Sequence, residues 1–245
     1  MSDKDLSSIR LPLNWKVGSD LMSKLLFNNP MIVNLVSKNI PADSYKVTPN
    51  EWADGTRSDV VYSVRDKSTV ETPPILIEFQ SKVSSNFMGR LIRYSLSCEG
   101  RYNVYPIVLI FAINGFSSLE VEKEFVGDNG SPFLKIGSKF WAKECLLISQ
   151  SSIEACLNQT PLDPIVALGY FLTSGSLSLN TLEHKLDHTV QQLYQTSYKL
   201  VMAELKHKNK SVEPLQSLLE QVKRRIETVV DEDNSVMIVV VLTTK

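Results

Sequence analysis

Two short apolar runs separated by one helical stretch constrain the fold of this chain more than any other feature. The first run, residues 75–80, has the sequence ILIEFQ, and the second, residues 105–113, has the sequence YPIVLIFAI. Their length, composition and flanking turn residues are typical of buried strands. From Phe87 onward, apolar residues recur at helical spacing between the two runs. A strand–helix–strand order favours a crossover connection and a partly parallel sheet.

Weaker signals surround this unit. A helix with Ser19 as a candidate cap ends before Pro30, and residues 31–40 continue as a second helical stretch. Residues 43–58 have the composition of a loop with one short strand, and residues 59–64 have the composition of a strand. The next region alternates turns with short strand-like pieces up to about residue 150.

The pattern changes to helical after residue 150. The expected helices cover residues 161–172, 179–208 and 212–230. We therefore predict an α/β protein with a mixed β-sheet flanked by helices in residues 1–150, and a mainly helical C-terminal appendage in residues 151–245.

Composition excludes several classes of protein. Lys and Arg number 26 against 27 Asp and Glu, so the net charge of -1 excludes a grossly basic nucleic-acid coat but allows an enzyme with a local basic patch. The three cysteines lack a Cys-x-x-Cys spacing, which argues against disulfides and structural zinc. With no apolar run of about 18 residues and a polar N-terminus, we expect a soluble, intracellular protein without a membrane segment, in cytoplasm or nucleus.

One charged residue stands out, because Glu78 lies inside an apolar strand where an isolated carboxylate is costly. Strand alternation puts Glu78 and Gln80 on the same face of the sheet. A neighbouring strand that begins at Asp59 would bring a second acid to that face. Two such charges about 4 Å apart repel by roughly 4 kcal/mol at an effective dielectric near 20. A divalent cation bound between them turns this net repulsion into a net attraction. The pair therefore favours a Mg²⁺ site. The alternative is a solvent-facing Glu78 on a half-exposed strand.

The following helix adds a cation and a phenol. Arg90 and Tyr94 are four residues apart and share a face, with Arg93 beside them. An arginine there is suited to bind a phosphate oxygen. Equally good interpretations are that the arginines are surface charges of the helix and that Tyr94 is a tyrosine of the core.

Taken in order, these segments resemble the PD-(D/E)XK nuclease superfamily, and most of all its recombination-promoting nuclease and transposase-like branch. The matching segments are Asp20-x-x-x-Lys24-x-x-Phe27, Arg57-Ser58-Asp59, Ile77-Glu78-Phe79-Gln80-Ser81, Arg90-Leu-Ile-Arg-Tyr94 and residues 105–115. The resemblance covers roughly residues 19–116. It implies a restriction-endonuclease-like core, DNA as the partner, and Mg²⁺-dependent (or Mn²⁺-dependent) phosphodiester hydrolysis, with a link to mobile elements or recombination.

The resemblance also implies roles for individual residues. Asp59 and Glu78 would be metal ligands, together with the backbone carbonyl of Phe79, and Asp20 would be an additional acid near the metal. Tyr94 matches the tyrosine of the family's helix. Arg90 or Arg93 would bind phosphate.

The sequence departs from the superfamily at Gln80, which stands where the superfamily has lysine and is expected to position water. Glutamine forms hydrogen bonds but supplies neither charge nor a base at neutral pH. Two alternatives to an active nuclease therefore stay open, and both are compatible with the same fold. One is a catalytically inactive module that binds nucleic acid or protein. The other is an interaction protein that forms homo-oligomers through the helices in residues 179–230.

Overall fold

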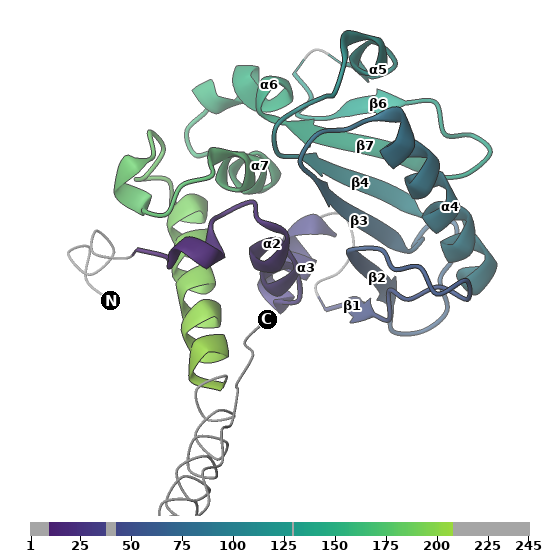
Figure 1. Ribbon diagram of the computed structural model, residues 1–245, viewed down its shortest axis with the longest axis horizontal. Helices are drawn as coiled ribbons and strands as arrows, with labels where there is room; N and C mark the ends of the chain where they lie inside the picture. Colours follow the sequence, from purple (N-terminus) through teal and green to yellow (C-terminus); the bar gives the residue numbers. More distant parts are fainter. Residues whose placement is uncertain (1–9, 38–42, 129, 208–245) are drawn as a thin grey trace, which may run out of the picture. The chain divides into compact units, whose positions relative to one another are not determined.

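The computed structural model describes residues 10–37, 43–128 and 130–207, and its centre is a seven-stranded mixed sheet in the order β1-β2-β3-β4-β7-β6-β5 (Figure 1). The strands are β1 (Tyr45–Thr48), β2 (Val60–Val64), β3 (Ile75–Gln80), β4 (Ile107–Ala112), β5 (Val126–Gly127), β6 (Leu134–Ile136) and β7 (Glu144–Ser149). Helices flank this sheet, so the α/β class predicted from the sequence is confirmed.

The chain divides into two compact units, residues 1–201 and 202–245, and the whole sheet belongs to the first. The division at residue 150 into a core and a helical appendage stays a prediction. No helix in the described part of the chain is both long and apolar enough to cross a membrane.

The predicted crossover unit is present. Strands β3 and β4 pair in parallel, and α4 (Ser85–Tyr102) connects them. Strand β2 pairs with β3 in antiparallel fashion, with Val60 opposite Ile77. The next position of this ladder places Asp59 opposite Glu78. The topology therefore brings the two predicted acids to the same level of neighbouring strands.

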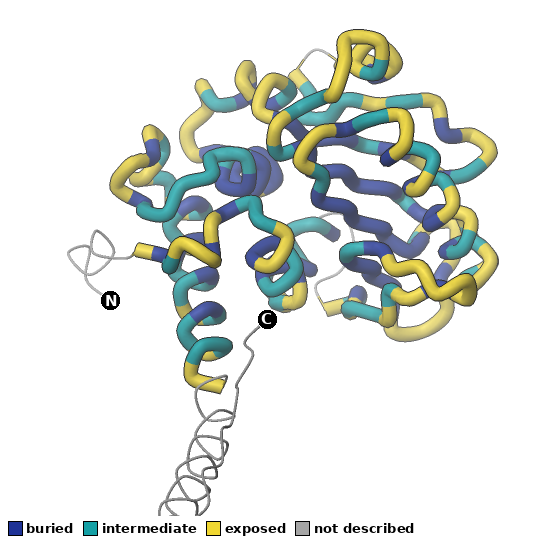
Figure 2. Tube along the Cα trace, in the orientation of Figure 1, coloured by how far each residue is buried: buried dark blue, intermediate teal, exposed yellow. Residues whose placement is uncertain are grey.

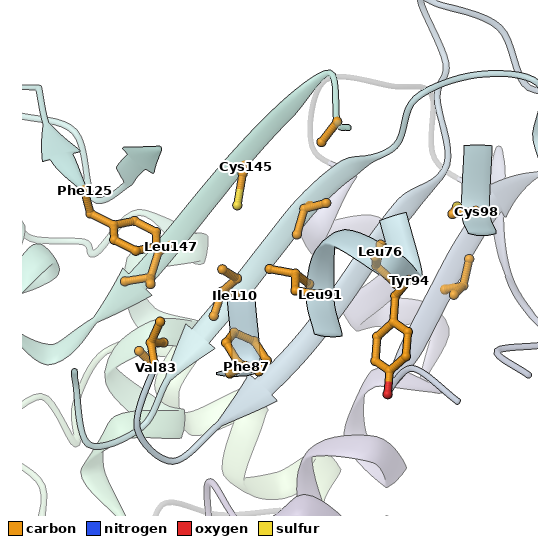
Figure 3. Packing of buried hydrophobic residues seen from close by; sticks show 14 of the residues in the cluster. Leu76, Val83, Phe87, Leu91, Tyr94, Cys98, Ile110, Phe125, Cys145 and Leu147 are labelled. Atoms are coloured by element: carbon orange, nitrogen blue, oxygen red, sulfur yellow. The ribbon is translucent and has the colours of Figure 1, made fainter. Parts of the chain in front are cut away.

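Helix α4 covers one face of the sheet with a continuous apolar cluster (Figure 3). Leu91 is fully buried against this face, and Leu76, Val61 and Ile110 belong to the same cluster. Glu78 lies two positions from Leu76 on β3, so strand alternation directs Glu78 to the α4 face, while Asp59 lies in the bend just before β2.

The opposite face packs against α2 (Asp20–Phe27), α3 (Pro30–Val36) and α7 (Pro164–Ser174), and the buried course of α7 is visible in Figure 2. Phe27 of α2 makes edge contacts with Phe79 and Phe111, with ring centres 4.7 and 5.4 Å apart. The Tyr62 hydroxyl donates to the Phe27 carbonyl over 2.7 Å. These contacts attach α2 directly to the strands that carry the acids.

Side-chain caps decide where the helices begin. Ser19 accepts from the Met22 N–H, as the sequence predicts. The predicted helix at 179–208 starts later in the structure: residues 179–181 form the 3₁₀ turn η3 (Leu179–Thr181), and the chain is helical from residue 188 up to residue 207, where the described part ends. Asp187 causes the later start, because its carboxylate accepts the Thr189 and Val190 N–H groups.

The remaining elements are short. They are η1 (Leu13–Trp15), α5 (Leu119–Lys123), α6 (Gln150–Ile153) and η2 (Glu154–Asn158). The helical stretch predicted at 31–40 ends at Val36 as a regular helix. Residues 38–42 and the helix predicted at 212–230 lie outside the described residues.

Gly18 lets the chain enter α2 against the backbone of α7. Its φ is +77°, and a Cβ at this position would lie 2.3 Å from the Leu172 carbonyl oxygen. That contact is with rigid backbone, so a side chain at position 18 requires α2 or α7 to shift. The placement of α2, and hence of its polar residues, depends on this glycine.

We predict that Gly18→Ala lowers the free energy of unfolding by about 1–3 kcal/mol, because it adds left-handed backbone strain to the clash. Gly100→Ala is the matched control, since it lies in α4 with nothing within 4 Å of its Cβ position, and helix propensity favours alanine there by up to about 1 kcal/mol. Urea unfolding measures both variants. Equal stability of Gly18→Ala and wild type would show that α2 does not need this close approach.

Candidate functional site

Asp59 and Glu78 are linked by reciprocal hydrogen bonds at the junction of β2 and β3. The Asp59 N–H donates to Glu78 Oε1 over 2.9 Å, and the Phe79 N–H donates to Asp59 Oδ2 over 2.8 Å. Each carboxylate is therefore held by a backbone group of the strand segment that carries the other. The structure thus brings together the two acids that the sequence pattern singles out.

Glu78 is buried, with 3% of its surface exposed. Burial raises the pKa of its carboxyl to about 8, and the negative charge of Asp59 adds to the shift. The hydrogen bond from the Asp59 backbone and the charges of Arg90 and Lys24 act in the opposite direction. The balance leaves Glu78 mainly protonated at neutral pH when no cation is bound.

The loop before β2 orients Asp59. The Asn50 side-chain amide donates to the carbonyls of Ser58 and Asp59 over 2.6 and 2.9 Å. Arg101 of α4 donates to two further carbonyls of this loop, and its guanidinium lies 4.3 Å from the centre of the Trp52 ring. The loop is thus tied to α4, which fixes the direction of the Asp59 N–H.

Lys24 of α2 also reaches the acids, and no role for it was predicted from the sequence. Its Nζ lies 2.9 Å from Asp59 Oδ1 and 2.7 Å from Asp20 Oδ1. Burial lowers the pKa of Lys24, but hydrogen bonds and charge from Asp20 and Asp59 outweigh it, so the net pKa is raised. Asp20 therefore joins the site through Lys24. The Asp20–Lys24 spacing of four was the signal in the sequence for this contact.

Gln80 and Arg90 lie together on the solvent side of Glu78. Arg90 Nη2 donates to Gln80 Oε1 over 3.4 Å, and Gln80 Nε2 donates to the Lys82 carbonyl over 3.1 Å. The Arg90 guanidinium also lies 5.4 Å from the centre of the Phe87 ring. The exposed Arg90 is thus directed toward the strand that carries Glu78 and Gln80.

Tyr94 lies at the margin of the apolar cluster, and its hydroxyl points away from the other labelled side chains (Figure 3). Desolvation raises the pKa of Tyr94, Arg90 lowers it, and the charges of Glu78 and Asp59 raise it further. The dependence on Glu78 and Asp59 indicates that the phenol lies within electrostatic reach of the acids. The raised pKa keeps the hydroxyl protonated, so Tyr94 is a hydrogen-bond donor at neutral pH.

Arg93 is exposed and lies nearer the loop before β2. Hydrogen bonds from Thr56 lower the pKa of Asp54 in that loop, and the charge of Arg93 contributes to the same shift. The two arginines of α4 are therefore placed differently: Arg90 contacts Gln80, and Arg93 acts on Asp54. A phosphate-binding role for Arg93 stays a prediction.

Two cavities lie elsewhere in the sheet region, and neither is lined by Asp59 or Glu78. One, of about 650 Å³, is lined mainly by apolar side chains near the start of β3 and β4. The other, of about 850 Å³, lies at the ends of β4 and β7 and includes Asn114, Ser149 and His184.

The donor set of the site consists of carboxylate and carbonyl oxygens, the ligands that Mg²⁺ prefers. Both acids retain lone pairs beyond the hydrogen bonds described above. In residues 10–37, 43–128 and 130–207, no group of three or more His, Cys, Asp or Glu side chains gathers closely enough to hold a metal. Two protein carboxylates would suit a cation that keeps several water ligands, as Mg²⁺ does.

Comparisons with protein-family models, with curated proteins and with solved structures found no match for this chain. A function is therefore inferred from the geometry and electrostatics of the Asp59–Glu78 pair and its neighbours.

We predict that stability falls with rising pH because of Glu78. The folded metal-free protein keeps the Glu78 proton up to a pKa of about 8, while the unfolded chain releases it near the ordinary value of 4.5. Between these values the folded state binds more protons. The free energy of unfolding therefore decreases as pH rises, by at most about 1.4 kcal/mol per pH unit.

Glu78→Gln removes this titration. It should therefore make the free energy of unfolding nearly independent of pH between pH 5 and 8, as measured by urea unfolding in the presence of a chelator. Glu122→Gln, on the exposed surface of α5, is the control and should keep the slope of the wild type. An unchanged slope in Glu78→Gln would contradict the assignment of the proton to Glu78.

Proposed function

We propose that this protein is a metal-dependent DNA endonuclease that hydrolyses phosphodiester bonds. The observation that carries the proposal is the pairing of Asp59 with a buried, proton-retaining Glu78 on neighbouring strands. Two ionised carboxylates at this position would be costly unless a cation compensated them, which agrees with Glu78 keeping its proton while no metal is bound. Sites with such perturbed acids are strong candidates for function.

The topology supports membership of the PD-(D/E)XK nuclease superfamily. The antiparallel strands β1, β2 and β3, the crossover helix α4 and the parallel strand β4 follow the order of elements that the sequence resemblance implies. The restriction-endonuclease-like core, and the link to its recombination-promoting and transposase-like branch, are proposed on this agreement together with the motif residues.

The residues that would hold Mg²⁺ or Mn²⁺ are Asp59 and Glu78, with the Phe79 carbonyl as a further oxygen. The ion supplies Lewis-acid activation of water and neutralises charge on the phosphate. Because ligands must be deprotonated, metal binding would release the proton that Glu78 keeps in the metal-free protein. The role predicted for Asp20 as an additional acid is now proposed alongside its contact with Lys24.

The other side chains have roles that their positions support. Gln80 is half-exposed next to Glu78 and is suited to orient the attacking water by hydrogen bonding. Arg90 is directed to the same place and is suited to bind a phosphate oxygen. Tyr94 supplies a neutral hydroxyl donor. Together these groups would bind and orient DNA at the acid pair.

A catalytically inactive module that binds nucleic acid or protein is the second candidate. The observation that favours it is Gln80, which cannot supply the positive charge expected of lysine at this position. Such a descendant would keep the fold and lose the metal chemistry. Self-association through the helices of residues 179–230 is compatible with either candidate and stays a prediction.

We predict that the purified protein nicks or linearises supercoiled plasmid DNA in Mg²⁺ or Mn²⁺, and that a chelator abolishes this. Asp59→Asn and Glu78→Gln should reduce cleavage by about 100-fold or more, because loss of one ligand weakens both metal binding and transition-state stabilisation. Asp66→Asn, an exposed acid in the bend after β2, should retain full activity.

Cleavage at the same rate by wild type, Asp59→Asn and Glu78→Gln would place the activity elsewhere or in a contaminant. Isothermal titration with Mg²⁺ separates the two candidate functions. Metal binding that Glu78→Gln abolishes supports the nuclease site. Absence of both metal binding and cleavage in the wild type favours the inactive module.

A further inference from the structure

Lys24 lies between two carboxylates at the edge of the proposed site. It forms ion pairs with Asp20 and Asp59, and the exposed fractions of the three side chains are 37%, 66% and 14% respectively. The Lys24–Asp59 pair is therefore the more buried of the two, while Asp20 lies in solvent. Ion pairs of this partly exposed kind form and break readily.

The position of Lys24 is set by the core. Phe27 lies three residues later on α2, on the same side of the helix, and its ring packs against Phe79 and Phe111 of β3 and β4. At the other end of α2, Ser19 caps the helix. The helix is thus fixed on the sheet, and Lys24 reaches Asp59 from the side opposite α4.

Lys24 and a metal ion compete for the same oxygen. Asp59 Oδ2 is engaged by the Phe79 N–H, and Asp59 Oδ1 faces Lys24 Nζ. A divalent cation shared with Glu78 also needs an Asp59 oxygen, and a neighbouring ammonium would repel it by Coulomb interaction. The flexible stem of lysine allows the ammonium to move without any change in the helix.

We propose that Lys24 is the exchangeable cation of this site, and this inference rests on the function proposed above. Its ammonium pairs with Asp59 while no metal is bound, and it leaves Asp59 when a divalent cation binds. Asp20 retains Lys24 by their second ion pair, which holds its charge next to the site. From there Lys24 neutralises a phosphate of the bound DNA, which supplies the charge that Gln80 lacks.

The first test measures metal binding alone. Mg²⁺ and Mn²⁺ are titrated into DNA-free wild type, Lys24→Gln, Lys24→Arg and Lys123→Gln, and thermal unfolding confirms that each variant is folded. Lys24→Gln should bind metal at least about threefold more tightly, since it removes a competing charge in a pair of ordinary strength. Lys24→Arg should stay within about twofold of wild type. Lys123→Gln, which removes an exposed charge on α5, should show no change.

Equal or weaker metal binding by Lys24→Gln overturns the exchange. A merely structural role for Lys24 would weaken metal binding through loss of site geometry, so tighter binding separates the two explanations.

The second test measures cleavage of a labelled duplex at saturating metal. Lys24→Gln should lower kcat/KM by about tenfold or more in spite of its tighter metal binding, because a charge-assisted contact to phosphate is lost, and Lys24→Arg should restore part of it. Undiminished cleavage by Lys24→Gln overturns the phosphate contact. If wild type cleaves nothing and Lys24→Gln still binds metal more tightly, the nuclease function fails while the exchange stands.

Discussion

Two backbone N–H groups hold two carboxylates at the point where β2 and β3 meet, and the features of the site follow from this arrangement. The Asp59 N–H binds Glu78, and the Phe79 N–H binds Asp59. These hydrogen bonds compensate part of the cost of burying acids in an otherwise apolar sheet. The register of β2 against β3 determines whether they form, since a shift by one residue would turn either acid to the opposite face.

Without a metal ion, a proton and an ammonium group offset the negative charge of this acid pair. Burial and the nearby Asp59 leave Glu78 with its proton, and Lys24 supplies a single positive charge from outside the sheet. The proton of Glu78 and the ammonium of Lys24 are both readily replaced by another cation. A well-packed pair of apolar side chains in place of the two acids would make the protein more stable. The retention of two acids at this position is understandable if they bind a divalent ion.

Much of the fold was predictable because it depends on local patterns. The limits of β3, the crossover by α4 and the cap at Ser19 follow from apolar periodicity and short-range hydrogen bonding. The alternation that aligns Glu78 with Gln80 needed no tertiary information. The central position of β7, between β4 and β6, was not predicted, since strand order depends on contacts distant in sequence.

The site was predictable only where it depends on such local patterns. The Asp59–Glu78 pairing follows from neighbouring strands, but the contact of Lys24 with Asp59 depends on how α2 packs through Phe27, which periodicity alone does not reveal. The later start of the helix at residue 188 likewise depends on Asp187, whose carboxylate also accepts the Leu162 N–H. Tertiary packing decided both.

A crystal structure of the protein with Mn²⁺, with the ion located by its anomalous scattering, tests the central claim most directly. A cation bridging the acids should give an anomalous peak between Asp59 and Glu78, within about 2–2.3 Å of an oxygen of each, with Lys24 Nζ displaced from Asp59. An anomalous map without a peak at saturating Mn²⁺, with the Lys24–Asp59 ion pair intact, would contradict a cation site at this pair of acids.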